Sequence, residues 1–104
     1  MRELIDDIRR WRDQGDGVVV ATVVGTRRSA PRPVGSSFAV SSSGALCGSV
    51  SGGCVESAIV QEAEEVFETG KPKLLTYGIS DDEGWNVGLP CGGEIDVWVE
   101  RYQP

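Results

Sequence analysis

The sequence of 104 residues contains no histidine, which excludes Ser-His-Asp and Cys-His nucleophilic machinery as well as histidine-ligated metal sites. Its three cysteines, Cys47, Cys54 and Cys91, include no short-spaced pair. The sequence therefore indicates neither a disulfide framework nor a structural zinc site, and we expect no metal site in the protein. Thiols that stay reduced are the expectation for a cytoplasmic protein.

Long hydrophobic runs are also lacking. No stretch of 18 apolar residues is present, and the N-terminus lacks the basic, apolar and small-residue zones of a secretory signal. We therefore expect a cytoplasmic protein without a membrane span. Positive charge is scarce as well, since 10 basic residues against 16 acidic ones give a net charge of −6. This balance disfavours nucleic-acid binding, although a small anion could bind where Arg27, Arg28 and Arg32 gather.

Periodicity along the chain predicts two helices and several strands. Apolar residues at helical spacing predict helices at 3–14 and 55–69, the second of which stops at Gly70. The expected strands are a central strand at 18–24 that is covered on both faces, a hairpin at 37–40 and 45–50, and further strands at 73–77 and 94–101. Residues 25–35 and 78–93 are expected to form loops.

This order of elements predicts an α/β fold in which a mixed sheet carries two main helices. Strand, helix and strand between 45 and 77 would form one right-handed crossover unit. The length suits one small domain over residues 1–104, whose modest burial favours a homodimer. No strand-initiated G-x-G-x-x-G fingerprint is present, so we expect no Rossmann-like second domain.

The most informative motif is a strand that breaks through glycines into the second helix, Gly48-Ser-Val-Ser-Gly-Gly-Cys-Val-Glu56. Glycines let the backbone approach a ligand closely, and the free amides at a helix start attract anions such as phosphate. The same dipole favours the thiolate of Cys54, which could act as a nucleophile or bind a metal. Alternatively, the glycines only form a tight turn, Cys54 fills a small apolar pocket, and Glu56 is simply a favourable acid in the first helical turn.

A second cysteine lies beside paired glycines in Gly88-Leu-Pro-Cys-Gly-Gly93, at the end of the long loop. If both motifs meet at one end of the sheet, Cys54 and Cys91 would face a ligand together, as two soft donors or as a sulfur-transfer pair. The alternative is that Cys91 is a buried small residue in a turn fixed by proline. Cys47, inside a predicted strand, is interpreted as a core residue.

The loop Arg27-Arg-Ser-Ala-Pro-Arg-Pro33 offers forked guanidinium donors for phosphate or for a pterin edge, held in order by proline. The alternative is that these arginines only keep the loop solvated. Trp11, Trp85 and Trp98 are interpreted as packing residues, with Trp85 in the glycine-rich loop as the exception that could stack on a ligand.

The two glycine and cysteine motifs, preceded by the Val23–Gly35 segment, resemble the N-terminal domain of the XdhC/CoxI family over nearly the whole chain. The resemblance implies an accessory protein that binds the molybdenum cofactor and promotes its sulfuration and insertion into a xanthine dehydrogenase or CO dehydrogenase type enzyme. It also implies, as partners, the molybdenum hydroxylase apoenzyme and a sulfur-donor protein. Many relatives continue into a Rossmann-like domain, and here either a separate subunit would supply that domain or the protein would work without it.

Carried onto this sequence, the resemblance implies a cofactor site from the two glycine and cysteine motifs, with the arginine and proline loop as its neighbouring wall. The implied residues are Ser51, Gly52, Gly53, Cys54, Glu56, Cys91, Gly92 and Gly93, with Arg28, Ser29, Pro31 and Gly35 in the wall. We expect a chaperone that is not an enzyme. The alternative is a thiol-dependent redox or sulfur-transfer enzyme in which Cys54 attacks and Cys91 resolves, and a third possibility is a purely structural partner domain.

Overall fold

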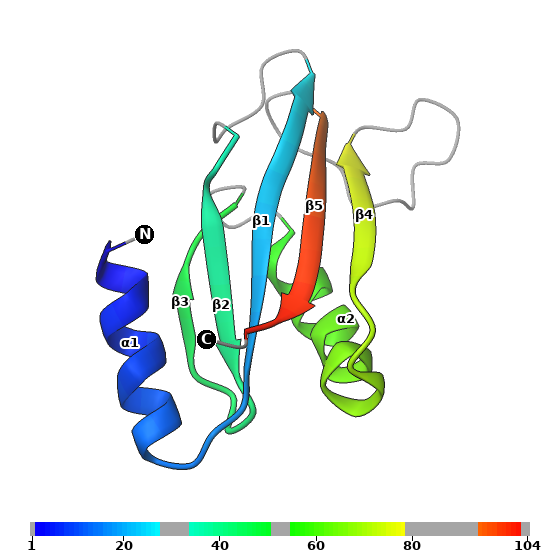
Figure 1. Cartoon of the computed structure of the whole chain (residues 1–104). Coiled ribbons are helices and arrows are strands. Elements are labelled where there is room, and N and C mark those ends of the chain that lie inside the picture. Colours follow the sequence, from blue (N-terminus) through cyan, green and yellow to red (C-terminus); the bar gives the residue numbers. More distant parts are fainter. Residues whose placement is uncertain (1, 28–33, 51–54, 79–93, 103–104) are drawn as a thin grey trace.

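The computed structural model describes residues 2–27, 34–50, 55–78 and 94–102, which form a five-stranded sheet with one helix on each face (Figure 1). The elements in chain order are α1 (Arg2–Asp13), β1 (Val18–Arg27), β2 (Ser37–Ser41), β3 (Leu46–Gly48), α2 (Glu56–Thr69), β4 (Lys73–Gly78) and β5 (Glu94–Arg101). This arrangement confirms the predicted α/β class with two main helices in one small domain.

The strand order in the sheet is β3-β2-β1-β5-β4. All four neighbouring pairs are antiparallel, which differs from the expected mixed pairing. The difference arises because β5, the last strand, inserts between β1 and β4. The crossover through α2 is present, but it joins β3 and β4, which run in the same direction at opposite edges of the sheet.

Strand β1 lies at the centre and is buried on both faces, as its continuous β-branched sequence predicts. Val19, Ala21 and Val23 point toward α2, in a cluster with buried residues of α2, β2 and β5. Val18 and Val20 point the other way, toward α1. Alternation along one strand therefore supplies apolar side chains to two separate cores.

Helix α1 contributes Leu4, Ile8 and Trp11 to the smaller core, at the spacing that places them on one face of the helix. Helix α2 contributes Ile59, Ala63 and Val66 to the larger core. Burying one side chain such as Ile59 stabilises the fold by about 1.5–3 kcal/mol, so both helices are held chiefly by these apolar faces. With 12 and 14 residues, neither helix is long enough to cross a membrane, a finding that concerns the described residues alone.

Strand β1 is three residues longer than predicted, because residues 25–27 continue the pairing with β5 instead of beginning a loop. The register shifts between Val23 and Gly25, so Val24 is an extra residue on β1 and is exposed. Beyond this bulge, Arg27 pairs with Glu94. The bulge explains the misprediction: Gly25 suggests a strand end, whereas the ladder resumes one residue out of register.

Candidate functional site

The ends of three strands lie side by side at one end of the sheet (Figure 1). Glu94, the first residue of β5, pairs with Arg27, the last residue of β1, and with Gly78, the last residue of β4. Arg27, Gly78 and Glu94, the described residues next to 28–33 and 79–93, therefore lie in one row of the sheet. The described residues that flank these two predicted motifs are neighbours, although the motif residues themselves lie outside the described ranges.

Helix α2 points its N-terminal end toward the same end of the sheet, since its C-terminus leads into β4, which then runs up to Gly78 (Figure 1). Val55 occupies the N-cap position with φ −120° and ψ 1°, and no side-chain hydrogen bond caps the helix there. Polar N-cap residues normally satisfy one of the first amides of a helix, and valine has no atom that can do so. The acid in the first turn of this helix is Glu56, whose charge the helix dipole favours at this end.

Glu56, in the first turn of α2, reaches back to the segment that follows β3. Its Oε2 accepts a hydrogen bond from Ser49 Oγ at 2.8 Å and another from the backbone N–H of Val50 at 2.8 Å. Val50 and Val55 are both fully buried in the larger core. The carboxylate and this packing therefore hold Val50 and Val55, the described residues on either side of the predicted cofactor-binding residues 51–54.

Gly35 is the second predicted site residue that the structure describes. It has a φ of +97°, and its N–H donates to the carbonyl oxygen of Val23 at 2.8 Å. The carbonyl oxygen of Ser36 accepts the N–H of Val23 at 2.9 Å, so residues 35 and 36 follow β1 as the chain returns to β2. Gly35 thus supplies a left-handed backbone conformation to the end of the arginine and proline loop.

The remaining predicted site residues lie outside the described residues, as does Trp85. They are Arg28, Ser29, Pro31, Ser51, Gly52, Gly53, Cys54, Cys91, Gly92 and Gly93. Sequence reasoning missed Ser49 and the backbone of Val50 as partners of Glu56. Local spacing gave no signal for these partners, which lie seven and six residues before Glu56, outside the capping-box pattern of an acid at the third helical position and the N-cap amide.

Cys47, interpreted as a core residue, is half-buried against the α1 core and has a polar contact. Its thiol donates to Asp7 Oδ2 at 2.7 Å. This thiol and the Arg10 guanidinium hold the pKa of Asp7 below its ordinary value of 3.8, against a smaller upward effect of burial. Within the described ranges, no group of three or more potential metal-ligating side chains of His, Cys, Asp or Glu occurs.

Comparison with known proteins identifies relatives of much greater length. The chain is 40% identical over 90 residues to the molybdenum cofactor insertion chaperone PaoD of Escherichia coli, which covers 86% of this chain and 28% of PaoD. It is 35% identical over 85 residues to a protein of Bacillus subtilis named as a probable subunit of xanthine dehydrogenase, covering 80% of this chain and 26% of that protein.

Among solved structures, a xanthine dehydrogenase from Bacillus halodurans has the same fold, with a TM-score of 0.78 and 26% identity over 95% of this chain and 30% of that one. The chain thus spans between 26% and 30% of the length of these three proteins. The model of the XdhC and CoxI family matches residues 11–78, more than half of the chain. The sequence motifs, the sheet topology and this match agree, and the chain belongs to the XdhC and CoxI family.

Proposed function

We propose that the chain binds the molybdenum cofactor and assists its sulfuration and insertion into a xanthine dehydrogenase or CO dehydrogenase type enzyme. The observation that carries the proposal is the pairing of Glu94 with both Arg27 and Gly78. This pairing brings the described residues next to two of the predicted motifs into one row of the sheet. The similarity to PaoD, named as a molybdenum cofactor insertion chaperone, supports the same role.

The chemistry of the donor set fits this cofactor. Thiolates of Cys54 and Cys91 suit a soft or borderline metal centre, and the start of α2 suits the phosphate of the pterin. Arg28 and Ser29 would donate to the same anionic group. When bound, the cofactor supplies the oxygen- and sulfur-coordinated metal that the hydroxylase uses, and the chain's own residues bind, orient and shield it.

The described contacts refine the role of Glu56 in this proposal. Its Oε2 already accepts two hydrogen bonds, from Ser49 and Val50. We therefore assign Glu56 to positioning residues 51–54 through these two hydrogen bonds.

The proposal requires two partners, the apoenzyme that receives the cofactor and a protein that donates sulfur. A homodimer and a separate Rossmann-domain subunit remain predictions of the sequence. The chain is expected to act in the cytoplasm, where molybdenum hydroxylases of this kind would be loaded.

The test is an anaerobic titration of the purified chain with molybdenum cofactor released from a molybdoenzyme, followed by gel filtration and quantification of the pterin as its oxidised fluorescent derivative. Cys54→Ser and Cys91→Ser are expected to lower the retained pterin at least tenfold, about 1.4 kcal/mol of binding. Cys47→Ser is the matched control, because Cys47 lies outside both glycine motifs and contacts Asp7 of α1.

Two results would contradict the proposal. One is that no pterin elutes with the parent chain, and the other is that all three cysteine variants retain it equally. If instead the parent transfers several equivalents of sulfur per chain through a persulfide on Cys54, the chain is a sulfur-transfer enzyme, the alternative interpretation of the two cysteines.

A further inference from the structure

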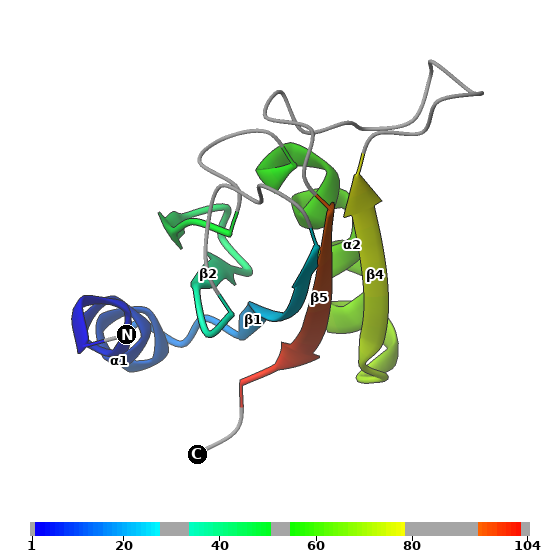
Figure 2. The same cartoon turned by 90° about the horizontal axis from the view of Figure 1, so that it is seen from above.

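Helix α1 covers only part of the sheet face on which it lies (Figure 2). It packs on β1, β2 and β3. On the same face, β5 and β4 carry Trp98 and Leu74, which are cross-strand neighbours and are 36% and 59% exposed. In the described part of the chain, no helix covers this half of the face, whereas α2 covers the opposite one.

The uncovered width matches one helix. Neighbouring strands lie about 4.8 Å apart, so two strands present a strip of about 10 Å, and a helix with its side chains is about 10–12 Å in diameter. A helix laid beside α1 would complete the layer that α1 begins. Exposed, adjacent Trp and Leu side chains on a sheet are the type of apolar surface that binding partners bury.

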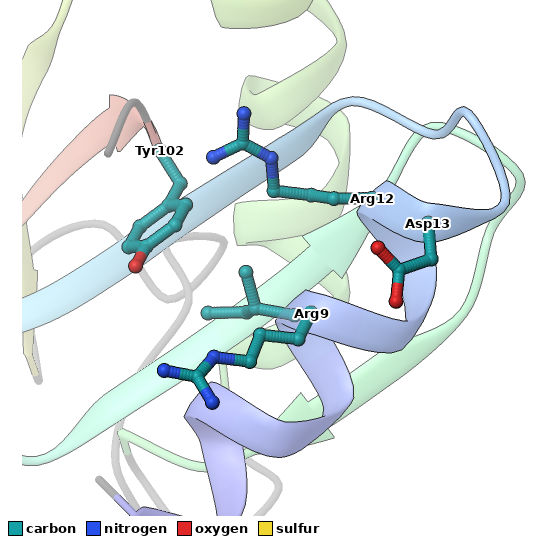
Figure 3. Close-up of a pocket in the computed structure, with 5 residues that line it drawn as sticks. Arg9, Arg12, Asp13 and Tyr102 are labelled. Carbon is teal, nitrogen blue, oxygen red and sulfur yellow. The ribbon is translucent and has the colours of Figure 1, made fainter.

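Two arginines and one aspartate lie at the border of this strip toward α1 (Figure 3). A cleft of about 280 Å³ lies there between α1 and the residue that follows β5, and it is lined by Ile8, Arg9, Arg12, Asp13 and Tyr102. The Arg12 guanidinium lies over the Tyr102 ring, 5.7 Å from its centre. Among the described residues, neither Arg9 nor Arg12 forms an ion pair with a carboxylate.

We propose that this surface docks an amphipathic helix of a partner protein. The helix would place apolar side chains on Trp98 and Leu74 and acidic side chains along the edge that faces Arg9 and Arg12. In the described structure these two guanidinium groups have no carboxylate partner, although the chain as a whole carries a net charge of −6. They are therefore the local feature that favours a partner helix with an acidic edge.

A carboxylate in the exposed strip restricts which side chains the partner helix can place there. The Trp98 indole N–H donates to Glu100 Oε2 at 2.8 Å, so a carboxylate lies beside the apolar pair. The partner's apolar face therefore carries no acid there. A second copy of this chain fits poorly, because the carboxylate of Glu100 beside the apolar pair would then meet a face that carries the same acid.

This inference does not depend on cofactor binding and is tested without it. The probe is a fluorescein-labelled 18-residue designed helical peptide with a leucine face and glutamates along one edge, and the comparison peptide has lysines along that edge. Fluorescence anisotropy is expected to show binding of the acidic-edge peptide at least tenfold tighter than that of the basic-edge peptide.

Three test variants and two control variants locate the binding surface. Trp98→Ala and Leu74→Ala are expected to weaken binding about tenfold and about fivefold, and the control Leu46→Ala, at an equally exposed leucine on β3, leaves it within twofold. Arg9→Glu is expected to weaken binding at least fivefold, and Lys71→Glu, the same charge change beyond α2, leaves it within twofold. Circular dichroism checks that each variant folds.

Equal affinity for the two peptides, or equal effects of the test and control variants, would overturn the proposal. Self-association of the chain in sedimentation, abolished by either Trp98→Ala or Leu74→Ala, would assign the surface to a second copy and would also overturn it. Loss of cofactor binding in the cysteine variants leaves the expected peptide affinity unchanged, which separates this inference from the proposed function.

Discussion

The carboxylate of Glu56, at the start of α2, accepts a hydrogen bond from the hydroxyl of Ser49, which follows β3, over 2.8 Å. The same oxygen accepts the backbone N–H of Val50, a fully buried residue. One side chain thus ties the end of a strand to the beginning of the next helix. The segment between them, residues 51–54, carries the glycine and cysteine motif on which the proposed function depends.

Removal of this carboxylate is expected to destabilise the fold. Glu56→Ala leaves the buried amide of Val50 without its acceptor, a loss of about 1–3 kcal/mol in the free energy of unfolding. Glu56→Gln keeps one acceptor oxygen without the charge and is expected to lose about half as much. Urea denaturation followed by circular dichroism measures both values.

The control for Glu56 is Glu64→Ala, which removes an exposed acid from the same helix and is expected to change stability by less than about 0.5 kcal/mol. Equal stability of Glu56→Ala and Glu64→Ala would contradict the anchoring role. Pterin retention by Glu56→Gln, measured as for the cysteine variants, is expected to fall while its circular dichroism spectrum is unchanged.

Gly48, the last residue of β3, is expected to tolerate no side chain. Its φ is +84°, and an added Cβ would lie 2.4 Å from the carbonyl oxygen of Ser37 and 3.0 Å from Leu4 Cδ1. Left-handed backbone costs an L-residue about 1–2 kcal/mol, and overpacking adds about 1–3 kcal/mol. Gly48→Ala is therefore expected to lower the free energy of unfolding by at least about 2 kcal/mol in urea denaturation.

Gly44, at the tip of the β2–β3 hairpin, separates these two causes. Its φ of +98° imposes the same backbone strain, but an added Cβ there meets nothing within 4 Å. Gly44→Ala is expected to cost only the strain, about 1–2 kcal/mol. If both variants lost equal stability, the contact of the added Cβ with Ser37 would make no contribution to the destabilisation of Gly48→Ala.

Much of this fold follows from local sequence patterns. Residues 94–101 alternate apolar and polar side chains and form β5 with the predicted bounds, and Gly70 ends α2 in a left-handed conformation, with φ 72°. The pairing of strands was predicted less well, because it depends on contacts between distant segments. Insertion of β5 between β1 and β4 leaves no local signal in either strand.

In the candidate site, too, local features were predictable from the sequence and tertiary contacts were not. The acid at Glu56 was recognised from its place in the first turn of the helix, but its attachment to Ser49 and Val50 is a tertiary contact that propensity does not report. Cys47 was interpreted as a core residue because it lies within a predicted strand. Its contact with Asp7 depends on how α1 packs, which the strand sequence cannot specify.

The contact between Cys47 and Asp7 predicts a specific acid sensitivity. Because the folded pKa of Asp7 lies below 3.8, the folded state binds the proton more weakly than the unfolded state. The stability that Asp7 contributes is therefore present above the unfolded pKa and is lost as the pH falls through the folded pKa. The stability difference between the parent and Asp7→Asn is expected to shrink below about pH 4.

Asp6→Asn, on the same helix, controls for the loss of one negative charge. In carboxyl NMR titrations, Cys47→Val is expected to raise the pKa of Asp7 because it removes the thiol donor, while Cys47→Ser keeps a donor and the low pKa. An unchanged pKa in Cys47→Val would show that Arg10 alone lowers it.

The half-buried phenol of Tyr77, on β4, predicts a loss of stability at alkaline pH. Burial, with a smaller contribution from the charge of Glu62, raises the pKa of Tyr77 from 10.0 to about 12. Between these values the unfolded chain loses the phenolic proton while the folded chain keeps it, so the free energy of unfolding falls as the pH rises.

Tyr77→Phe is expected to lose less stability than the parent between pH 10 and 12. The ultraviolet absorbance of the phenolate should show a transition near pH 12 in the parent that is missing in the variant. A Tyr77 phenol that titrates near pH 10 in the folded protein would mean that the β4 edge admits water to this side chain.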